Sequence, residues 1–351
     1  MFPTFAVGGA QIRFTTLANH FGREWRHAIV AMDGVTTARE RLDAGLDVVF
    51  PEIEVRKGDT VGNVRRFRAA IGALGPRTML THNFGSLEWS MANRLKMVEQ
   101  VHVEDGFGPE ERAQQLPRRV WLRRLFLRGR TVALPSRTLM RIALDVWRLP
   151  SARVNYVPNG IDLVRFGGPK PTRSGPGETP VIGTVAALRP EKNVARLVRA
   201  FALANATAPA RLVIVGDGSE RTALEALVDQ LGVRERVRFE GHVRDPAALI
   251  RGLDVFAMSS DTEQMPISLL EAMAAGLPVA ATNVGDIAAM LPAAQRRLVV
   301  PQDDAALGTA LAELVGSDDL RASLGAANRL RAEAEFDETV MFSRWAKLLA
   351  A

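Results

Sequence analysis

Two glutamates stand eight positions apart in the segment TEQMPISLLEAMAAGLP, residues 262–278. Glu263 lies among polar and turn-forming residues, whereas Glu271 lies inside an apolar run of small residues that is typical of a helix. Ionised carboxylates accept hydrogen bonds from hydroxyl groups, so two of them at different depths of one cleft suit a polyhydroxylated ligand. The pattern fits equally well a helix with one acid at its N-terminus and one acid in solvent.

The segment LRPEKN, residues 188–193, places two cations ahead of another predicted helix. Arg189 and Lys192 would lie near the helix N-terminus, where a positive charge opposes the helix dipole. Binding to a phosphate would explain a cation at that place. A solvated first turn in which Glu191 is the partner is an equal alternative.

The glycine pair Gly8 and Gly9, in VGGAQ, lies between the first predicted strand and the first predicted helix. Two glycines there let the backbone turn tightly and point N–H groups at an anion, although a plain strand-to-helix turn has the same sequence. The dinucleotide fingerprint G-x-G-x-x-G is missing at this place and also at GDGSER, residues 216–221.

The elements that must position these residues are short apolar runs alternating with helix-length segments, the pattern of parallel sheets wrapped by helices. A stretch rich in Pro and Gly at 157–180 interrupts the alternation and predicts a domain boundary. We therefore expect an α/β protein with two Rossmann-like domains facing across a cleft, whose ligands bind at the carboxyl ends of strands. The expected domains are 1–165 and 178–335, with 336–351 as a helix that packs back toward the first domain.

The expected elements can be stated by residue range. Strands are expected at 2–7, 27–32, 47–50, 77–82, 96–102, 130–135 and 153–158, and then at 181–188, 211–216, 236–241, 254–259 and 277–282. Helices are expected at 10–22, 60–73 and 110–127 in the first half, between the strands of the second half, and from about residue 303 onward.

The composition is that of an ordinary globular protein, with 47% hydrophobic and 24% charged residues. A chain of 351 residues exceeds one ordinary core and fits two domains. It contains no Cys, which excludes a disulfide framework and thiolate chemistry, and it has no apolar run long enough to span a membrane. Because the first residues do not resemble a secretory signal, we expect a cytoplasmic protein.

Charge is distributed unevenly along the chain. Residues 1–165 hold 25 Lys and Arg against 16 Asp and Glu, a net charge of +9, and the remainder holds 20 against 23, a net charge of −3. Residues 112–144 have nine arginines and no acid, and six of the nine lie in RRVWLRRLFLRGR at 118–130. This basic segment suits an anionic membrane surface, here the inner face of the cell membrane, or equally a domain helix with solvated arginines. We do not expect nucleic acid as a partner, because no nucleic-acid-binding module accompanies the charge.

Taken in order, the motifs GGAQ (8–11), VPNGID (157–162) and EKN (191–193), with the glutamate pair and its AMAAGLPV (272–279), resemble the family 4 glycosyltransferases. The resemblance covers essentially the whole chain. It implies the GT-B arrangement, in which a nucleotide-sugar binds between two Rossmann-like domains. It also implies transfer with retention of anomeric configuration, no cofactor and no bound metal, and the sequence has no D-x-D carboxylate pair.

The resemblance also assigns roles to residues. Glu271 would bind the ribose hydroxyls, Glu263 the hydroxyls of the donor sugar, and Lys192 the diphosphate. His102, in VEQVHVEDGFG, matches the family histidine that lies over the donor sugar, and His82 at another strand end is a weaker candidate. Without the resemblance, a lone histidine at a strand end is more often a satisfied structural residue.

Gly8 and Gly9 would form the backbone loop beside the phosphates and the acceptor. The expected catalytic residues are thus His102, Lys192 and Glu263. The expected donor-binding residues are Gly8, Gly9, Arg189, Lys192, Glu263, Gln264, Met265, Ile267 and Glu271.

Three features depart from the family pattern. The family often has an arginine where this chain has Ala187, and we expect Arg189 to substitute for it. Gln-Met-Pro replaces the common Gly-Phe-Gly after the first glutamate, and Pro266, expected in the first helical turn, has no N–H to offer a ligand. The first strand is short, so we expect that Met1 stands for a valine at an alternative start codon and that part of the strand is missing.

These observations together predict a retaining hexosyltransferase. We expect it to move a sugar from a nucleotide-sugar, with a UDP-sugar slightly favoured, to a saccharide or lipid-linked saccharide in cell-surface polysaccharide or glycolipid synthesis. A non-hydrolysing sugar-nucleotide epimerase shares the two-domain arrangement but needs acid and base residues that the sequence does not reveal. A non-catalytic sugar-nucleotide-binding or membrane-associated scaffold is the other alternative.

Overall fold

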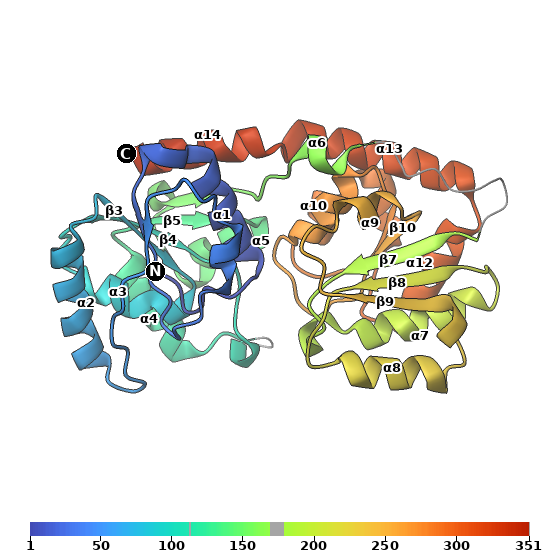
Figure 1. Ribbon diagram of the computed structural model, residues 1–351, viewed down its shortest axis with the longest axis horizontal. Coiled ribbons are helices and arrows are strands. Elements are labelled where there is room, and N and C mark those ends of the chain that lie inside the picture. The colour runs from blue at the N-terminus through green and yellow to red at the C-terminus, as the bar shows by residue number, and fades with distance from the viewer. Residues whose placement is uncertain (112–113, 169–178, 351) are drawn as a thin grey trace. The chain divides into compact units, whose positions relative to one another are not determined.

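The computed structural model describes residues 1–111, 114–168 and 179–350, and it divides the chain into two compact units (Figure 1). The first unit comprises 1–159 and 341–351, and the second comprises 160–340. Of the expected linker, residues 169–178 lie outside the described residues. Within the described ranges, no helix is long and apolar enough to cross a bilayer.

The second unit contains a six-stranded parallel sheet in the order β12-β11-β10-β7-β8-β9. Strand order reverses between β7 and β10, and ligands of such sheets bind outside the carboxyl ends of strands at this switch point. The strands are β7 (Val181–Val185), β8 (Arg211–Val215), β9 (Val237–Gly241), β10 (Val255–Met258), β11 (Val279–Thr282) and β12 (Val299–Val300).

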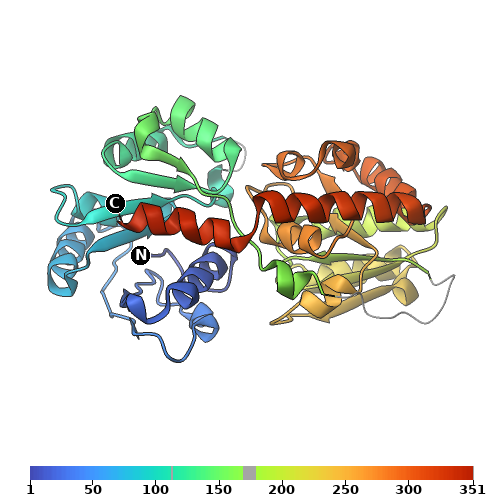
Figure 2. The same cartoon turned by 90° about the horizontal axis from the view of Figure 1, so that it is seen from above.

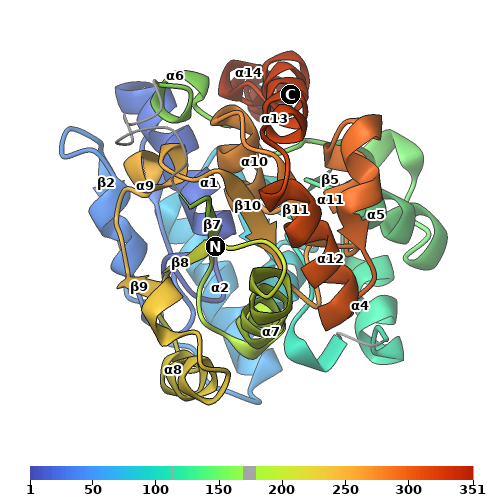
Figure 3. The same ribbon diagram turned by 90° about the vertical axis from the view of Figure 1, so that its right-hand side faces the viewer.

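Helices cover both faces of this sheet, and two apolar cores result. Along β10 the side chains alternate, so that Val255 and Ala257 join one core while Phe256 and Met258 join the other. Figure 3 shows α7, α8 and α12 on one side of the strands and α9, α10 and α13 on the other. The helices are α6 (Leu163–Phe166), α7 (Val194–Asn205), α8 (Arg221–Gln230), α9 (Ala247–Arg251), α10 (Ile267–Ala274), α11 (Ile287–Met290), α12 (Asp304–Val315) and α13 (Asp318–Glu335).

The first unit contains a four-stranded parallel sheet, β3-β4-β5-β6, and a separate parallel pair, β1-β2. Residues 1–2 join them. Phe2 bridges Ala31 after β1, while the N–H of His82 on β3 donates to the Met1 carbonyl over 3.0 Å. Residues 1–2 thus occupy the central place in the sheet, where strand order reverses. The strands are β1 (His27–Ala28), β2 (Val48–Val49), β3 (Thr78–His82), β4 (Glu99–Val103), β5 (Thr131–Leu134) and β6 (Val154–Tyr156).

Two sets of helices cover the faces of the first unit's sheet. On one face, α1 and α14 pack against β4 and β5, and Figure 2 shows α14 lying across this face. The core on this side includes Leu17 of α1 and Phe342 and Trp345 of α14. On the other face lie α2 to α5. The helices are α1 (Gly9–Phe21), α2 (Thr60–Leu74), α3 (Leu87–Ala92), α4 (Pro117–Leu127), α5 (Arg137–Arg141) and α14 (Glu338–Ala350).

Capping residues explain where several helices begin. The side chains of Asp59, Asn193, Asp303 and Ser317 each accept a hydrogen bond from a backbone N–H in the first turn of the helix that follows. Such a bond satisfies an N–H group that the helix itself cannot, and it stabilises the helix by about 1 kcal/mol.

Two expected elements of the first unit are wrong in their bounds. The strand expected at 2–7 is reduced to a single bridge at Phe2, because Pro3 has no N–H to continue the ladder. The helix expected at 110–127 begins only at Pro117, a residue that suits the first helical position, and a single 3-10 turn stands at Pro109–Glu111.

Inside the second unit, near the points where the chain passes to and from the first, one parallel bridge joins Ile161 to Asp337. Three carboxylates surround it, those of Asp162, Asp337 and Glu338. Burial, together with the charges of Asp162 and Asp337, raises the pKa of Glu338 to about 6 against the opposing effect of Arg165.

Candidate active site

The loops that follow β7, β8 and β10 meet at the switch point of the second unit. Gly216 and Gly218, after β8, have φ angles of 136° and 157°, which other residues rarely adopt. A Cβ on Gly216 would stand 1.9 Å from the Ala186 carbonyl oxygen, and a Cβ on Gly218 would stand 2.4 Å from the Leu188 oxygen. These glycines therefore allow the β8 loop to pack against the backbone of the β7 loop that carries Lys192.

Lys192 and Glu263, predicted from separate motifs, come together at this edge. The Lys192 ammonium lies 2.6 Å from Glu263 Oε1, and the Ser260 hydroxyl donates to the same oxygen over 2.8 Å. The exposed fraction is 26% for the Lys192 side chain and 8% for that of Glu263. The Glu263 carboxylate is therefore largely buried, while the Lys192 ammonium remains accessible to a ligand.

A bracing network that sequence reasoning missed holds these two loops together. Arg196 on α7 donates to the Ser259 carbonyl and to Asp261 Oδ1, over 2.7 Å in each case. The Asn193 amide also donates to Asp261, over 3.1 Å, and the Asp261 N–H donates to the Glu191 carbonyl over 2.9 Å. The only sequence signals for this network were the acid in SSDTE and the cation after EKN, because its partners lie 63 or more residues apart.

Helix α10 begins directly in front of the Lys192–Glu263 pair. Pro266, expected inside the first turn, precedes it as the N-cap residue in extended conformation, so the first N–H groups of the helix are those of Ile267 and Ser268. A small pocket is lined by Lys192, Glu263 and Ser268, with Thr184, Val185, Ala186, Val194, Met258, Ser259 and Ser260. Cation, carboxylate, hydroxyls and helix N-terminus thus face one space.

The remaining donor-binding candidates of the second unit lie around this space. Glu271 is half-buried in α10, four residues after the helix begins, which is about 6 Å along its axis. Gln264 and Met265 form the turn between Glu263 and the helix, and Met265 is buried. Arg189 is exposed at the start of the 3-10 turn Pro190–Lys192.

In the first unit, the glycine pair forms the start of α1. Gly8 is the extended N-cap residue and Gly9 the first helical residue, which is exposed. A Cβ on Gly8 would stand 2.9 Å from Gln11 Oε1, the end of a flexible side chain. A larger residue therefore fits at position 8 only if the Gln11 side chain moves.

His102 is completely buried on β4 and belongs to a chain of polar groups. The Gln100 amide donates to the Thr81 hydroxyl over 3.1 Å, and Thr81 Oγ1 lies 2.9 Å from His102 Nδ1. The direction of the Thr81–His102 hydrogen bond depends on the tautomer of the ring, whose second nitrogen is Nε2. That nitrogen faces Glu104 Oε2 at 3.6 Å.

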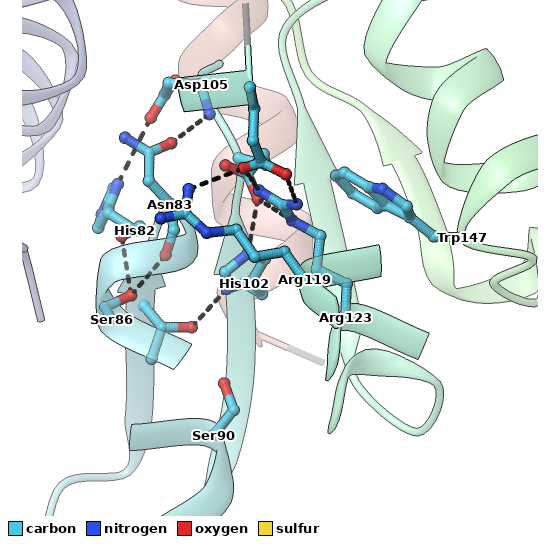
Figure 4. A network of polar contacts seen from close by, with 12 residues as sticks. His82, Asn83, Ser86, Ser90, His102, Asp105, Arg119, Arg123 and Trp147 are labelled. Carbon is cyan, nitrogen blue, oxygen red and sulfur yellow. Dashed lines mark hydrogen bonds and ion pairs between the residues drawn. The ribbon is translucent and has the colours of Figure 1, made fainter. Parts of the chain in front are cut away.

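The chain continues into a buried cluster of ion pairs that sequence reasoning missed (Figure 4). Arg123 on α4 binds Glu104 through Nε at 3.1 Å and Glu111 through both terminal nitrogens at 3.0 and 3.1 Å. All three side chains are fully buried. Burial alone would lower the pKa of Arg123, but Glu104 and Glu111 outweigh it and raise that pKa. The acid run EDGFGPEE before the basic segment was the signal for this cluster.

His82 and Asp105 lie beside this cluster, at the carboxyl ends of β3 and β4 (Figure 4). His82 Nδ1 is 3.7 Å from Asp105 Oδ2, and Asp105 Oδ1 is 2.6 Å from Arg13 Nη2. Burial lowers the pKa of His82 to about 4, against the opposing effect of Asp105. Burial alone would raise the pKa of Asp105, but Arg13 and His82 outweigh it and hold that pKa below its usual value.

The basic segment is less exposed than its sequence indicates. Arg123 is fully buried, Arg119 is paired with Glu110 and Glu111, and Arg130 donates to a backbone carbonyl inside the unit. Solvated arginines, one of the two alternatives, therefore describe only part of the segment, because the acids before it pair with Arg119 and Arg123. Residues 112 and 113, the first two of the predicted segment, lie outside the described residues.

Each unit matches a different family model. The model "Glycosyltransferase Family 4" matches residues 7–165, and "Glycosyl transferases group 1" matches residues 171–331. The chain is similar to a GDP-mannose-dependent monoacylated alpha-(1-6)-phosphatidylinositol monomannoside mannosyltransferase of Corynebacterium glutamicum, at 32% identity over 55% of each chain. A GDP-mannose-dependent alpha-(1-6)-phosphatidylinositol monomannoside mannosyltransferase of Mycobacterium tuberculosis is 34% identical over 51% of each chain. The chain thus spans about half the length of these curated relatives.

Solved structures match the whole fold. HepE of Anabaena in complex with UDP-glucose has a TM-score of 0.80 at 18% identity, with 99% of this chain and 98% of that chain covered. WaaG, a glycosyltransferase involved in lipopolysaccharide biosynthesis, has a TM-score of 0.73 at 16% identity, with 99% and 97% covered. Two Rossmann-like units, each with parallel strands, are the GT-B fold. With a family model on each unit, the chain belongs to the family 4 glycosyltransferases.

Proposed function

We propose that the protein is a retaining glycosyltransferase. It moves a hexose from a nucleotide-sugar to a saccharide or lipid-linked saccharide in cell-surface polysaccharide or glycolipid synthesis. The observation that carries the proposal is the meeting of Lys192 and Glu263 in front of α10, at the switch point of the second unit. An ammonium group with a helix N-terminus suits a diphosphate, and a sheltered carboxylate beside it suits sugar hydroxyls.

Donor binding is expected to rearrange the Lys192–Glu263 ion pair. The diphosphate competes for the Lys192 ammonium, which releases Glu263 Oε1 to accept a hydrogen bond from a sugar hydroxyl. Ile267 and Ser268 supply the first helical N–H groups, since Pro266 has none. As the sugar departs, Lys192 and these N–H groups stabilise the charge that develops on the phosphate.

A release assay for nucleoside diphosphate tests the proposal, with UDP-glucose, UDP-N-acetylglucosamine and GDP-mannose as donors and a bacterial lipid extract as acceptor. The curated relatives carry GDP-mannose in their names, and HepE was solved with UDP-glucose, so both nucleotides belong in the panel. We expect a glycosylated product whose anomeric configuration, read by NMR, matches that of the donor. We also expect turnover to persist in EDTA.

The site assignment is tested by Glu271→Gln, with the exposed Glu235→Gln as matched control. We expect donor affinity and turnover to fall in the first variant only, because a ribose-binding carboxylate is replaced by an amide. Unchanged donor binding in Glu271→Gln contradicts the assignment. An epimerised sugar-nucleotide without glycosylated product indicates the epimerase, and binding without any turnover indicates a scaffold.

We further propose that the outer face of α4 contacts an anionic membrane. Trp121 is 59% exposed and Leu125 48% exposed, and Arg118, Arg124 and Arg128 are exposed around them at helical spacing. Aromatic and aliphatic side chains surrounded by arginines suit the interface of an anionic bilayer. This face also suits an enzyme whose acceptor is anchored in lipid.

Flotation with phosphatidylcholine vesicles, with and without phosphatidylglycerol, tests the membrane proposal. We expect binding only to the anionic vesicles, weakened by salt and by Trp121→Ala together with Leu125→Ala. The matched control is Val61→Ala, which removes an exposed apolar side chain from α2 in the same unit. Equal flotation of the double variant and the control contradicts the proposal.

A further inference from the structure

Polar atoms without partners gather at one edge of the first unit. Across the described part of the chain, eleven buried side-chain nitrogen and oxygen atoms have no hydrogen-bond partner. Five of the eleven lie where β3 and β4 end and belong to His82, His102, Glu104 and Asp105, and a sixth, Arg13 Nη2, is ion-paired with Asp105 at 2.6 Å. A buried polar atom without a partner destabilises a fold, so a cluster of them requires an explanation.

The position of the cluster points to a ligand. Residues 1–2 occupy the centre of the sheet next to β3, and strand order reverses between them, so His82 at the end of β3 stands at the switch point. Ligands of parallel sheets bind outside the carboxyl ends of strands at such a point. Arg13 reaches the same edge from α1, and Asp105 reaches it from the end of β4.

His82 and Asp105 differ from the neighbouring His102 and Glu104 in what they contact. His102 is held by Thr81, and Glu104 is held by Arg123, so both belong to the internal network. Neither ring nitrogen of His82 has a hydrogen-bond partner, and its ring stacks on Phe2 at 3.9 Å and meets Phe14 edge-on at 6.3 Å. The 3.7 Å between His82 Nδ1 and Asp105 Oδ2 is too long for a hydrogen bond.

Charge and hydrogen-bonding capacity decide the class of ligand. The positive charge of Arg13 is already matched by Asp105 at 2.6 Å, and that of Arg123 by Glu104 and Glu111, so these cations offer little to an anionic ligand. A neutral imidazole offers one donor and one acceptor, and an ionised carboxylate offers acceptors only. A sugar hydroxyl, which both donates and accepts, complements this pair. Asp105, whose side chain is 16% exposed, connects the pair to the surface.

We propose that His82 and Asp105 bind hydroxyl groups of the acceptor sugar. That the sugar is the acceptor rests on the proposed function, whereas the sugar site itself rests on the first unit alone. Asp105 Oδ2 accepts the hydrogen of the sugar hydroxyl. The ring N–H of His82 donates a second hydrogen bond to the oxygen of that hydroxyl. The pair holds the acceptor in place, while Arg13 holds Asp105 in its ionised form and orientation.

His82→Phe is the decisive variant, because a phenyl ring preserves the stacking on Phe2 and removes both unpaired nitrogens. If those nitrogens serve a ligand rather than the fold, stability is retained or raised while sugar binding is lost. Asp105→Asn, which keeps the shape and removes the charge, is the second variant. The exposed His242→Gln and Asp43→Asn are the matched controls.

The full chain is tested with methyl α-D-mannopyranoside and methyl α-D-glucopyranoside as probes, by saturation-transfer NMR without donor. We expect signal from at least one glycoside with the wild-type protein and both controls, and none with His82→Phe or Asp105→Asn. Tryptophan fluorescence during urea unfolding checks the fold, and donor binding checks the second unit. We expect the unfolding midpoint of His82→Phe to equal or exceed that of the wild-type protein.

The outcomes separate this inference from the proposed function. Glycoside binding that survives His82→Phe overturns the inference, and so does a wild-type protein that binds neither glycoside. A large fall in the unfolding midpoint of His82→Phe overturns it as well, since the nitrogens then serve the fold. A wild-type protein that binds a glycoside through His82 but consumes no donor contradicts the proposed function alone.

Discussion

Arg123 gives the sharpest test of how the first unit is held together. Its guanidinium makes three charge-assisted hydrogen bonds to Glu104 and Glu111 and lies within 4.9–5.3 Å of the ring centroids of Phe84, Phe107 and Trp147. In Arg123→Met, Glu104 stays buried without its cation, whereas Glu111 keeps Arg119 at 3.1 Å. Removing one member of a buried ion pair destabilises a protein by about 3–5 kcal/mol, and the lost ring contacts add about 1 kcal/mol. Because Glu111 keeps a cationic partner, we expect the lower end of this sum, a loss of about 4 kcal/mol.

The assay can report on this unit alone. All five tryptophans of the chain, Trp25, Trp89, Trp121, Trp147 and Trp345, lie in the first unit, so tryptophan fluorescence follows its unfolding and not that of the second. For a urea dependence of about 2 kcal/mol per molar, a loss of 4 kcal/mol lowers the midpoint by about 2 M.

Two further variants make the reasoning refutable. Arg118→Met removes an exposed arginine from the same helix and should change the free energy of unfolding by no more than about 0.5 kcal/mol. Glu104→Gln and Glu111→Gln added to Arg123→Met remove the stranded charges and should restore much of the loss. If Arg123→Met unfolds within about 1 kcal/mol of the wild-type protein, the cluster does not hold the loop to α4 and the reasoning is wrong.

Two other predictions concern the second unit, which calorimetry or circular dichroism can follow. Gly285 has a φ of 56°, and a Cβ there would stand 2.1 Å from the Glu263 carbonyl oxygen, so Gly285→Ala should destabilise the unit by more than about 1 kcal/mol and weaken donor binding. Gly232→Ala, with a φ of 67° and open space for its Cβ, carries only the backbone penalty, so an equal effect of the two would refute the steric argument. Glu338, whose pKa is raised to about 6, favours the folded state below its ordinary pKa of 4.5, and this contribution is lost as pH rises through 6. Glu338→Gln should therefore flatten the fall in melting temperature between pH 4.5 and 7, and an unchanged fall would contradict the assignment.

The alternation of elements was predictable because parallel strands that are buried on both faces read as short apolar runs. Such runs do not show at which residue a strand stops pairing with its neighbour. The first strand, for example, is limited to one bridge by Pro3. Helix α3 was not predicted, since LEWSMA is short and its residues resemble those of the strands around it.

The candidate site was predictable only where local sequence carried the signal. Glu263 and Lys192 stand in motifs that a reader can recognise, and they meet in space. The groups that hold them do not, because Arg196 and Asp261 are ordinary charged residues until a fold brings them within 2.7 Å. The burial of Arg123 was not predicted for the same reason. An arginine in a basic helix points into the core only where acids elsewhere in the chain can pair with it.

The last helix sets the order in which the two units can be completed. Phe342 and Trp345 of α14 pack against Leu17 and Val103 in the core of the first unit, whereas the second unit is one uninterrupted stretch, 160–340. A ribosome therefore releases every residue of the second unit before it releases the helix that closes the first. Domains usually fold as they emerge, the N-terminal one first. Here we expect the N-terminal unit to finish last, with its apolar face open to chaperones until α14 has been synthesised.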